Sequence, residues 1–125
     1  MPPELISSLA VLGRILLGGL FVVGGITHFF ALSPITEVVR AKGIPLPGPS
    51  LIAASLFQIV AGLSLVLGWF VPPAASGLIL FTAVSSFVML DFWNQVGEQR
   101  TATINVWLSN IAIIGGLMLA AAHAR

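Results

Sequence analysis

Five residues near the start of the chain follow one another at helical spacing and could hold a polar ligand inside an apolar segment. Steps of four, three, four and three place them on one helix face: Arg14, Gly18, Phe21, Gly25 and His28. Arginine and histidine can donate hydrogen bonds to a carbonyl oxygen, and glycines let a ligand or another helix approach the backbone. The stripe therefore indicates a groove inside the protein, although Arg14 could instead extend along its own stem to the nearer membrane surface.

Two amide side chains, Gln58 and Asn110, lie in later apolar segments at depths similar to that of Arg14. By helical rise, Arg14 lies roughly 13 Å and Gln58 roughly 12 Å inside the ends of their segments. An amide buried in hydrocarbon without a partner is costly. We therefore expect Arg14, Gln58 and Asn110 to bond with one another or with unpaired backbone carbonyls. A purely structural polar clasp would use the same residues.

A second polar group follows the third apolar segment, at the level of His28. It contains Asp91, Trp93 and Asn94. Together with His28, these side chains predict a polar entrance through which a carbonyl-bearing ligand would reach the deeper arginine and glutamine. A solvated loop with ordinary interfacial aromatic residues would contain the same side chains.

Several kinds of chemistry are excluded or disfavoured by composition. The chain has no Cys, which excludes thiolate nucleophiles, disulfide relays and Cys-ligated iron–sulfur clusters. No His, Asp and Glu residues stand at the spacing of a metal site, and His28 and His123 are expected at opposite membrane surfaces, so neither a metal centre nor a bis-histidine haem is predicted. A net charge of +1 gives no basic surface for nucleic acid. No catalytic residue is assigned.

Four long apolar segments must position these side chains. The chain is 58% hydrophobic and only 7% charged, and a bilayer core needs about 20 apolar residues per helix. Segments of that length cover residues 5–31, 50–71, 73–92 and 104–122. The sequence therefore predicts an all-α polytopic membrane protein, an antiparallel bundle of four transmembrane helices forming one domain over residues 1–125.

A short interfacial helix is expected between the first two spans, near residues 34–42. Ser33 suits a helix N-cap, Pro34 a first helical position and Gly43 a helix end. Apolar residues at i, i+3 and i+4 would let this helix lie in the membrane surface. An irregular polar loop is the alternative.

The loops give a weak prediction of orientation. Four spans place loops 32–49 and 91–103 on the same side of the membrane. These loops carry three basic residues, against one or two at the opposite surface. The positive-inside rule therefore favours the cytoplasmic side for both loops.

The last apolar segment contains a ridge of small residues at four-residue spacing. Ala112, Gly116 and Ala120 would let another helix approach closely. We assign them, with Gly18 and Gly25, to helix packing. Packing within the bundle accounts for this ridge, so it does not by itself indicate a dimer.

Five landmarks resemble the DoxX family in order and spacing. They are LGR at 12–14, GITHF at 25–29, GIPLP at 43–47, DFW at 91–93 and NIAIIGG at 110–116. The family consists of small four-helix bacterial membrane proteins, named after a subunit of a terminal quinol oxidase and linked to thiosulfate:quinone oxidoreduction and redox-stress complexes. The resemblance implies the same fold in the inner (cytoplasmic) membrane, and it implies a link to quinones.

Three positions depart from the family pattern. Gln58 stands where the family commonly has Glu, Leu90 where a His often precedes DFW, and Ser109 where a Lys often precedes the fourth-span Asn. An acid, an imidazole and an amine are thereby missing from the expected polar centre, which argues against proton-coupled catalysis.

Two functions are expected from these features. The first is a quinone-linked redox-system component that binds a quinone-like or lipid headgroup, at most as a subunit of an oxidoreductase, with quinone as the only cofactor and none bound covalently. The second is a non-catalytic accessory or scaffold subunit of a larger bioenergetic membrane complex. The expected partners are membrane lipids and other membrane-protein subunits or a second copy of the chain, and no nucleic acid. A carrier for a lipid or small amphiphile is a third possibility.

Overall fold

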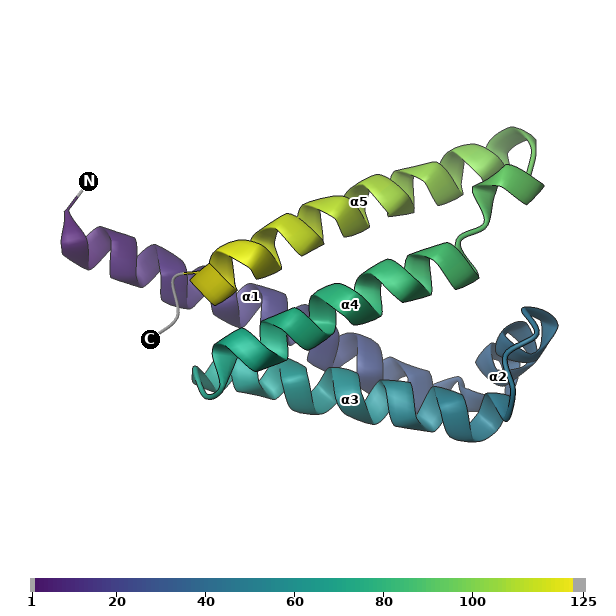
Figure 1. Ribbon diagram of the computed structural model, residues 1–125, viewed down its shortest axis with the longest axis horizontal. Coiled ribbons are helices and arrows are strands. Elements are labelled where there is room, and N and C mark those ends of the chain that lie inside the picture. The colour runs from purple at the N-terminus through teal and green to yellow at the C-terminus, as the bar shows by residue number, and fades with distance from the viewer. Residues whose placement is uncertain (1, 123–125) are drawn as a thin grey trace.

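The computed structural model describes residues 2–122, which form five α-helices and one short 3-10 helix (Figure 1). Four of the helices are long and apolar enough to cross a membrane, and the fifth lies between the first two spans. The predicted all-α fold is therefore confirmed. His123 lies outside the described residues. In chain order the elements are α1 (Pro3–Phe30), α2 (Leu32–Ala41), α3 (Pro47–Leu67), α4 (Val71–Met89), η1 (Phe92–Asn94) and α5 (Gly97–Ala122).

Proline and left-handed residues shape the tight turn between α3 and α4. Gly68 ends α3 with a φ of 78°, a conformation that glycine adopts without strain. Phe70 then precedes α4 with a φ of 52°. Two prolines, Pro72 and Pro73, occupy the first turn of α4, where backbone N–H groups need no intrahelical partner. The chain therefore reverses within Gly68–Phe70, and α3 and α4 form an antiparallel hairpin.

Each helix begins two to seven residues before its predicted range, and the starts of α2 and α5 show why. The short helix α2 begins at Leu32 with Ala31 as its N-cap, so Ser33 is not the cap and Pro34 lies inside the first turn. The chain bends at Ala31, directly after α1 ends, and this bend starts the new helix before Ser33 is reached. Helix α5 begins at Gly97 rather than at residue 104. Its first turns are polar, so the apolar run did not include them, but they are helical.

The bundle has two distinguishable ends. The α3–α4 turn lies at one end, called the turn end here, together with the start of α1 and the end of α5. Helix α2 and the segment between α4 and α5 lie at the other, called the loop end (Figure 1). An ion pair between Lys42 and Asp91 joins these two loop-end segments, so both loops lie on one side of the bundle.

Helices α1 and α3 cross with their backbones in contact. A Cβ added to Gly62 would lie 2.7 Å from the carbonyl oxygen of Gly18, and a Cβ on Gly18 would overlap the carbonyl oxygen of Gly62. Further along, a Cβ on Gly25 would lie 2.8 Å from the carbonyl oxygen of Ser55. Small residues allow this approach. Because lipid supplies no hydrophobic driving force between helices, the resulting van der Waals contact along both helices is what stabilises the pair.

The buried core is apolar toward the turn end. One cluster of buried residues draws on all four spans, with Leu65, Ala75, Leu78 and Leu117 completely inaccessible. The remaining members are Phe21, Ala61 and Val71. This cluster fixes the hairpin of α3 and α4 against α1 and α5.

The glycine contact predicts a position-specific loss of stability. Gly18→Ala should lower the free energy of unfolding by about 1–3 kcal/mol, because the added methyl group must push α1 away from α3. Gly19→Ala is the matched control: the space beside it is open, so the change should be neutral or slightly stabilising. Equilibrium unfolding in mixed detergent micelles measures both. Equal effects of the two substitutions would contradict the close crossing.

Candidate functional site

The bundle interior becomes polar toward the loop end. On α3, the buried stripe that contains Leu65 continues through Gln58 and Ser55, and on α4 it continues through Thr82 and Ser86. All four polar residues are buried, with Gln58 only 7% exposed. Both helices change from apolar to polar roughly three turns from the hairpin turn. The polar side chains of the two helices therefore occupy the same half of the bundle, called the polar half here.

Hydrogen bonds tie the polar half to the outer helices. His28 Nδ1 of α1 lies 3.0 Å from the hydroxyl of Ser55. On the other side, Asn110 of α5 donates through Nδ2 to the hydroxyl of Ser86 at 2.9 Å, and that hydroxyl donates to the Thr82 carbonyl at 2.7 Å. These bonds join α1 to α3 and α5 to α4. The sequence analysis identified His28 and Asn110 but not their hydrogen-bond partners, Ser55 and Ser86.

Two buried atoms of the polar half have no hydrogen-bond partner among the described residues. They are the side-chain oxygen Oε1 of Gln58 and the hydroxyl Oγ1 of Thr82. Leaving such a group unpaired costs roughly 1–3 kcal/mol each. The nearest atom that a Cβ on Gly24 would meet is Gln58 Nε2, at 3.5 Å, so the amide lies against α1. A group that donates to Gln58 Oε1, or one that accepts from Thr82 Oγ1, would remove the corresponding penalty.

Arg14 lies in the other half of the bundle. Its Nε donates to the carbonyl of Leu65 at 2.8 Å. The backbone N–H groups of Gly68 and Trp69 both donate to the carbonyl of Ser64. The carbonyl of Leu65 is therefore left for the guanidinium. Arg14 thus caps the C-terminus of α3, where a cation also interacts favourably with the helix dipole.

This position corrects the expected pocket. Of the partners proposed for Arg14, an unpaired backbone carbonyl is the one observed, and neither Gln58 nor Asn110 bonds to it. The cause is geometric, since α3 ends level with Arg14. The arginine is therefore at the turn end, three helical turns from the buried glutamine, and does not form a common pocket with it.

Gly18 and Gly25, assigned to helix packing from the sequence, are buried against the backbone of α3. The groove that the stripe indicated is thus occupied by another helix, and no room for a ligand exists beside these glycines. On α5, a Cβ on Gly116 would lie 3.2 Å from Leu17 Cδ1, and Ala120 packs against the buried core. Ala112 is exposed.

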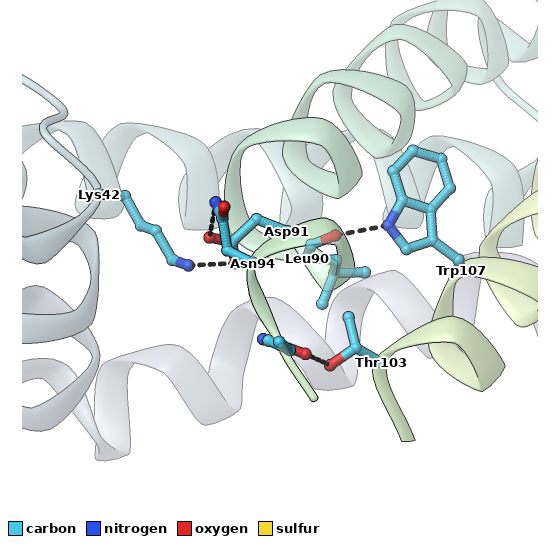
Figure 2. Close-up of polar contacts among 7 residues, drawn as sticks. Lys42, Leu90, Asp91, Asn94, Thr103 and Trp107 are labelled. Atoms are coloured by element: carbon cyan, nitrogen blue, oxygen red, sulfur yellow. Dashed lines mark hydrogen bonds and ion pairs between the residues drawn. The ribbon is translucent and has the colours of Figure 1, made fainter. Parts of the chain in front are cut away.

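The loop end is closed by an ion pair that joins α2 to the end of α4 (Figure 2). Lys42 Nζ lies 2.6 Å from Asp91 Oδ1, with both side chains about three-quarters buried. Asn94 donates to the other carboxylate oxygen at 3.2 Å. Trp93 is half exposed and stacks edge-to-face with Phe92. Sequence reasoning placed Asp91, Trp93 and Asn94 together but missed Lys42, whose position 49 residues earlier gave no local signal.

A second contact of the loop end fixes α5. Trp107 Nε1 donates to the Leu90 carbonyl at 2.6 Å, just beyond the last turn of α4 (Figure 2). The same indole lies 4.9 Å, centroid to centroid, from the ring of Phe87 at nearly right angles. Gln95 accepts from the hydroxyl of Thr103 at 2.5 Å. These bonds hold the α4–α5 connection rigidly above the polar half.

Residues 2–122 contain no group of three His, Asp or Glu side chains that could hold a metal ion. What they contain is a bundle of four membrane spans with a polar interior at one end and a buried apolar core at the other. These features define the class, a polytopic α-helical membrane protein.

The chain belongs to the DoxX family, whose sequence profile matches residues 9–91. The match begins within α1, continues through α4 and ends at Asp91, before α5. The chain is also similar to the inner membrane protein YphA of Escherichia coli (strain K12), with 25% identity over 114 residues that cover 90% of this chain and 81% of that protein. No solved structure matches.

The Lys42–Asp91 pair predicts energetic coupling between α2 and the end of α4. A double-mutant cycle with Lys42→Met and Asp91→Asn should show a favourable coupling free energy, because both side chains are largely removed from water. The control cycle uses Arg40 and Glu37, whose side chains are 60% and 67% exposed. It should show a smaller coupling. Chemical unfolding of the four variants of each cycle measures this, and equal coupling in the two pairs would contradict the prediction.

Proposed function

We propose that this DoxX-family protein binds a quinone-like headgroup in its polar half, as a component of a quinone-linked redox system in the bacterial inner membrane. The observation that carries the proposal is the pair of buried, unpartnered atoms, Gln58 Oε1 and Thr82 Oγ1. The name of the relative YphA supports the inner membrane as the location. The family resemblance supports the link to quinones.

The chemistry of the two unpartnered atoms matches both redox forms of such a headgroup. A carboxamide oxygen accepts a hydrogen bond, as a quinol hydroxyl requires. A threonine hydroxyl can donate, as a quinone carbonyl requires. Ser55 and His28 beside them already bond to each other and would orient the site. An apolar tail would extend between the helices into the lipid.

The proposal assigns binding and orientation to these side chains, not electron transfer. Gln58, Thr82, Ser86 and Asn110 carry no redox chemistry, and the chain has no Cys. Electrons would pass between the bound headgroup and a partner protein. The protein is thus proposed as a binding subunit rather than a self-sufficient enzyme.

An accessory subunit without a ligand is the second candidate, and α5 favours it. Of the 26 residues in α5, Leu117 is the one that is buried. Asn105 and Ser109 are both exposed and lie one turn apart, beyond the polar first turns of α5. Polar side chains of this kind are enriched where membrane helices meet. A partner subunit or a second copy of the chain would contact this face.

Gln58→Leu distinguishes the two functions. In ligand-free protein, the substitution should raise the free energy of unfolding by about 1–3 kcal/mol, because it removes an unpaired buried acceptor. At one hundred times their Kd, decylubiquinone and its reduced form should stabilise the unmodified protein by about 2.7 kcal/mol. Gln58→Leu should lose most of this stabilisation. Thermal unfolding in detergent with and without these probes measures both effects.

The control for this experiment is Ser64→Ala. Ser64 lies on the same helix but is partly exposed, and its hydroxyl donates to the Val60 carbonyl, so its loss should leave the response to decylubiquinone unchanged. If the probe stabilises neither protein, or stabilises Gln58→Leu as strongly as the unmodified chain, the quinone proposal is wrong. The accessory-subunit function would then be the one to pursue.

A further inference from the structure

Beyond the polar half, the turn end carries a groove between α1 and α5. Helix α1 continues past the α3–α4 turn (Figure 1), because Arg14 is level with the end of α3 while α1 begins at Pro3. The first turns of α1 therefore have no α3 beside them, whereas α5 still packs against the buried core through Ala120. A cavity of about 440 Å³ lies between α1 and α5, lined among others by Ile6, Leu9, Ala10 and Leu17 of α1 and by Leu119 and Ala120 of α5.

Among residues 2–122, Arg14 is the single polar side chain that lines this groove. One of the five N–H donors of its guanidinium is used on the Leu65 carbonyl. The ion pairs of residues 2–122 are Arg40 with Glu37 and Lys42 with Asp91, so no acidic side chain in this part of the chain neutralises Arg14. Glu4 is ten residues away on the same helix, about 15 Å by helical rise. The groove thus offers a cation and unused donors at the side of an apolar channel.

We propose that this groove binds an anionic phospholipid, with its phosphate on Arg14 and an acyl chain along the apolar lining. An anionic headgroup supplies the countercharge that a neutral quinone head would not. The groove extends from Ile6 to Leu17, roughly 16 Å of helix. An acyl chain can lie along this length, against the apolar side chains of α1 and against Leu119 and Ala120 of α5.

The lipid site is independent of the proposed quinone site. The two lie at opposite ends of the bundle and share no residue. A bound phosphate would also reinforce the turn end, because the guanidinium that it contacts caps α3. Lipid binding at this end would therefore stabilise the hairpin of α3 and α4.

Native mass spectrometry tests the charge requirement. Phosphatidylglycerol and phosphatidylethanolamine with identical acyl chains are titrated into the purified full-length protein in detergent. The unmodified protein should retain phosphatidylglycerol about fivefold more strongly, the ratio expected for one basic side chain facing an anionic headgroup. Arg14→Gln should abolish this preference and Arg14→Lys should largely keep it. Arg40→Gln, an exposed arginine at the loop end, should change nothing.

A second variant tests the groove without touching the arginine. Ala10→Phe fills the channel and should reduce retention of both lipids, whereas Ala53→Phe, at an exposed position of α3 outside the groove, should not. Circular dichroism verifies that each variant is folded. Equal retention of the two lipids by the unmodified protein, an unchanged preference in Arg14→Gln, unchanged retention in Ala10→Phe, or displacement of phosphatidylglycerol by decylubiquinone would each overturn the lipid assignment. The quinone proposal is tested separately, by the response of Gln58→Leu to decylubiquinone, so that either proposal can fail without the other.

Discussion

The contact of α1 with α3 through Gly18, Gly25 and Gly62 is the constraint on which the remaining structure depends. Lipid gives apolar helices no reason to associate, so the spans must gain stability from direct packing and from interhelical hydrogen bonds. Backbone contact provides the packing, and it also fixes the register of the two helices. In that register, Arg14 reaches the end of α3 and His28 reaches Ser55. A shift of one turn would leave a guanidinium and an imidazole without partners inside the membrane.

The interior divides the bundle into an apolar end and a polar end. At the turn end, large apolar side chains are fully inaccessible, and Arg14 caps a helix. At the loop end, His28 bonds to Ser55 and Asn110 bonds to Ser86, and two buried polar atoms have no partner among residues 2–122. Polar groups inside a membrane protein are expensive and mark functional sites by default. The ion pair and the Trp107 bond keep the connections above this end in place, which is what a preorganised binding site needs.

The sequence was sufficient for the helices but not for the neighbours of each polar residue. The apolar runs of the sequence predicted the four spans. The pattern around Pro34 predicted the short α2. The depth of Arg14 was counted along α1 only, and nothing in that count showed that α3 ends at the same level. Of the partners expected for Arg14, the backbone carbonyl is therefore the one that it bonds, and Gln58 is not. Ser55, Thr82 and Ser86 gave no signal, because small hydroxyl residues are common in membrane helices for packing reasons alone. Lys42 and Asp91 belong to distant segments, and their pairing follows from the tertiary arrangement.

The unequal helices have a consequence for the surrounding membrane. At 28 and 26 residues, α1 and α5 are about 42 Å and 39 Å long, whereas α3 and α4, at 21 and 19 residues, measure about 32 Å and 29 Å. A bilayer core of about 30 Å matches the inner hairpin. It also matches the apolar part of α5, because the first turns of that helix, residues 97–103, are polar. Helix α1 alone is apolar over nearly its whole length, so it must tilt, or the bilayer beside it must thicken, for its apolar side chains to stay out of water.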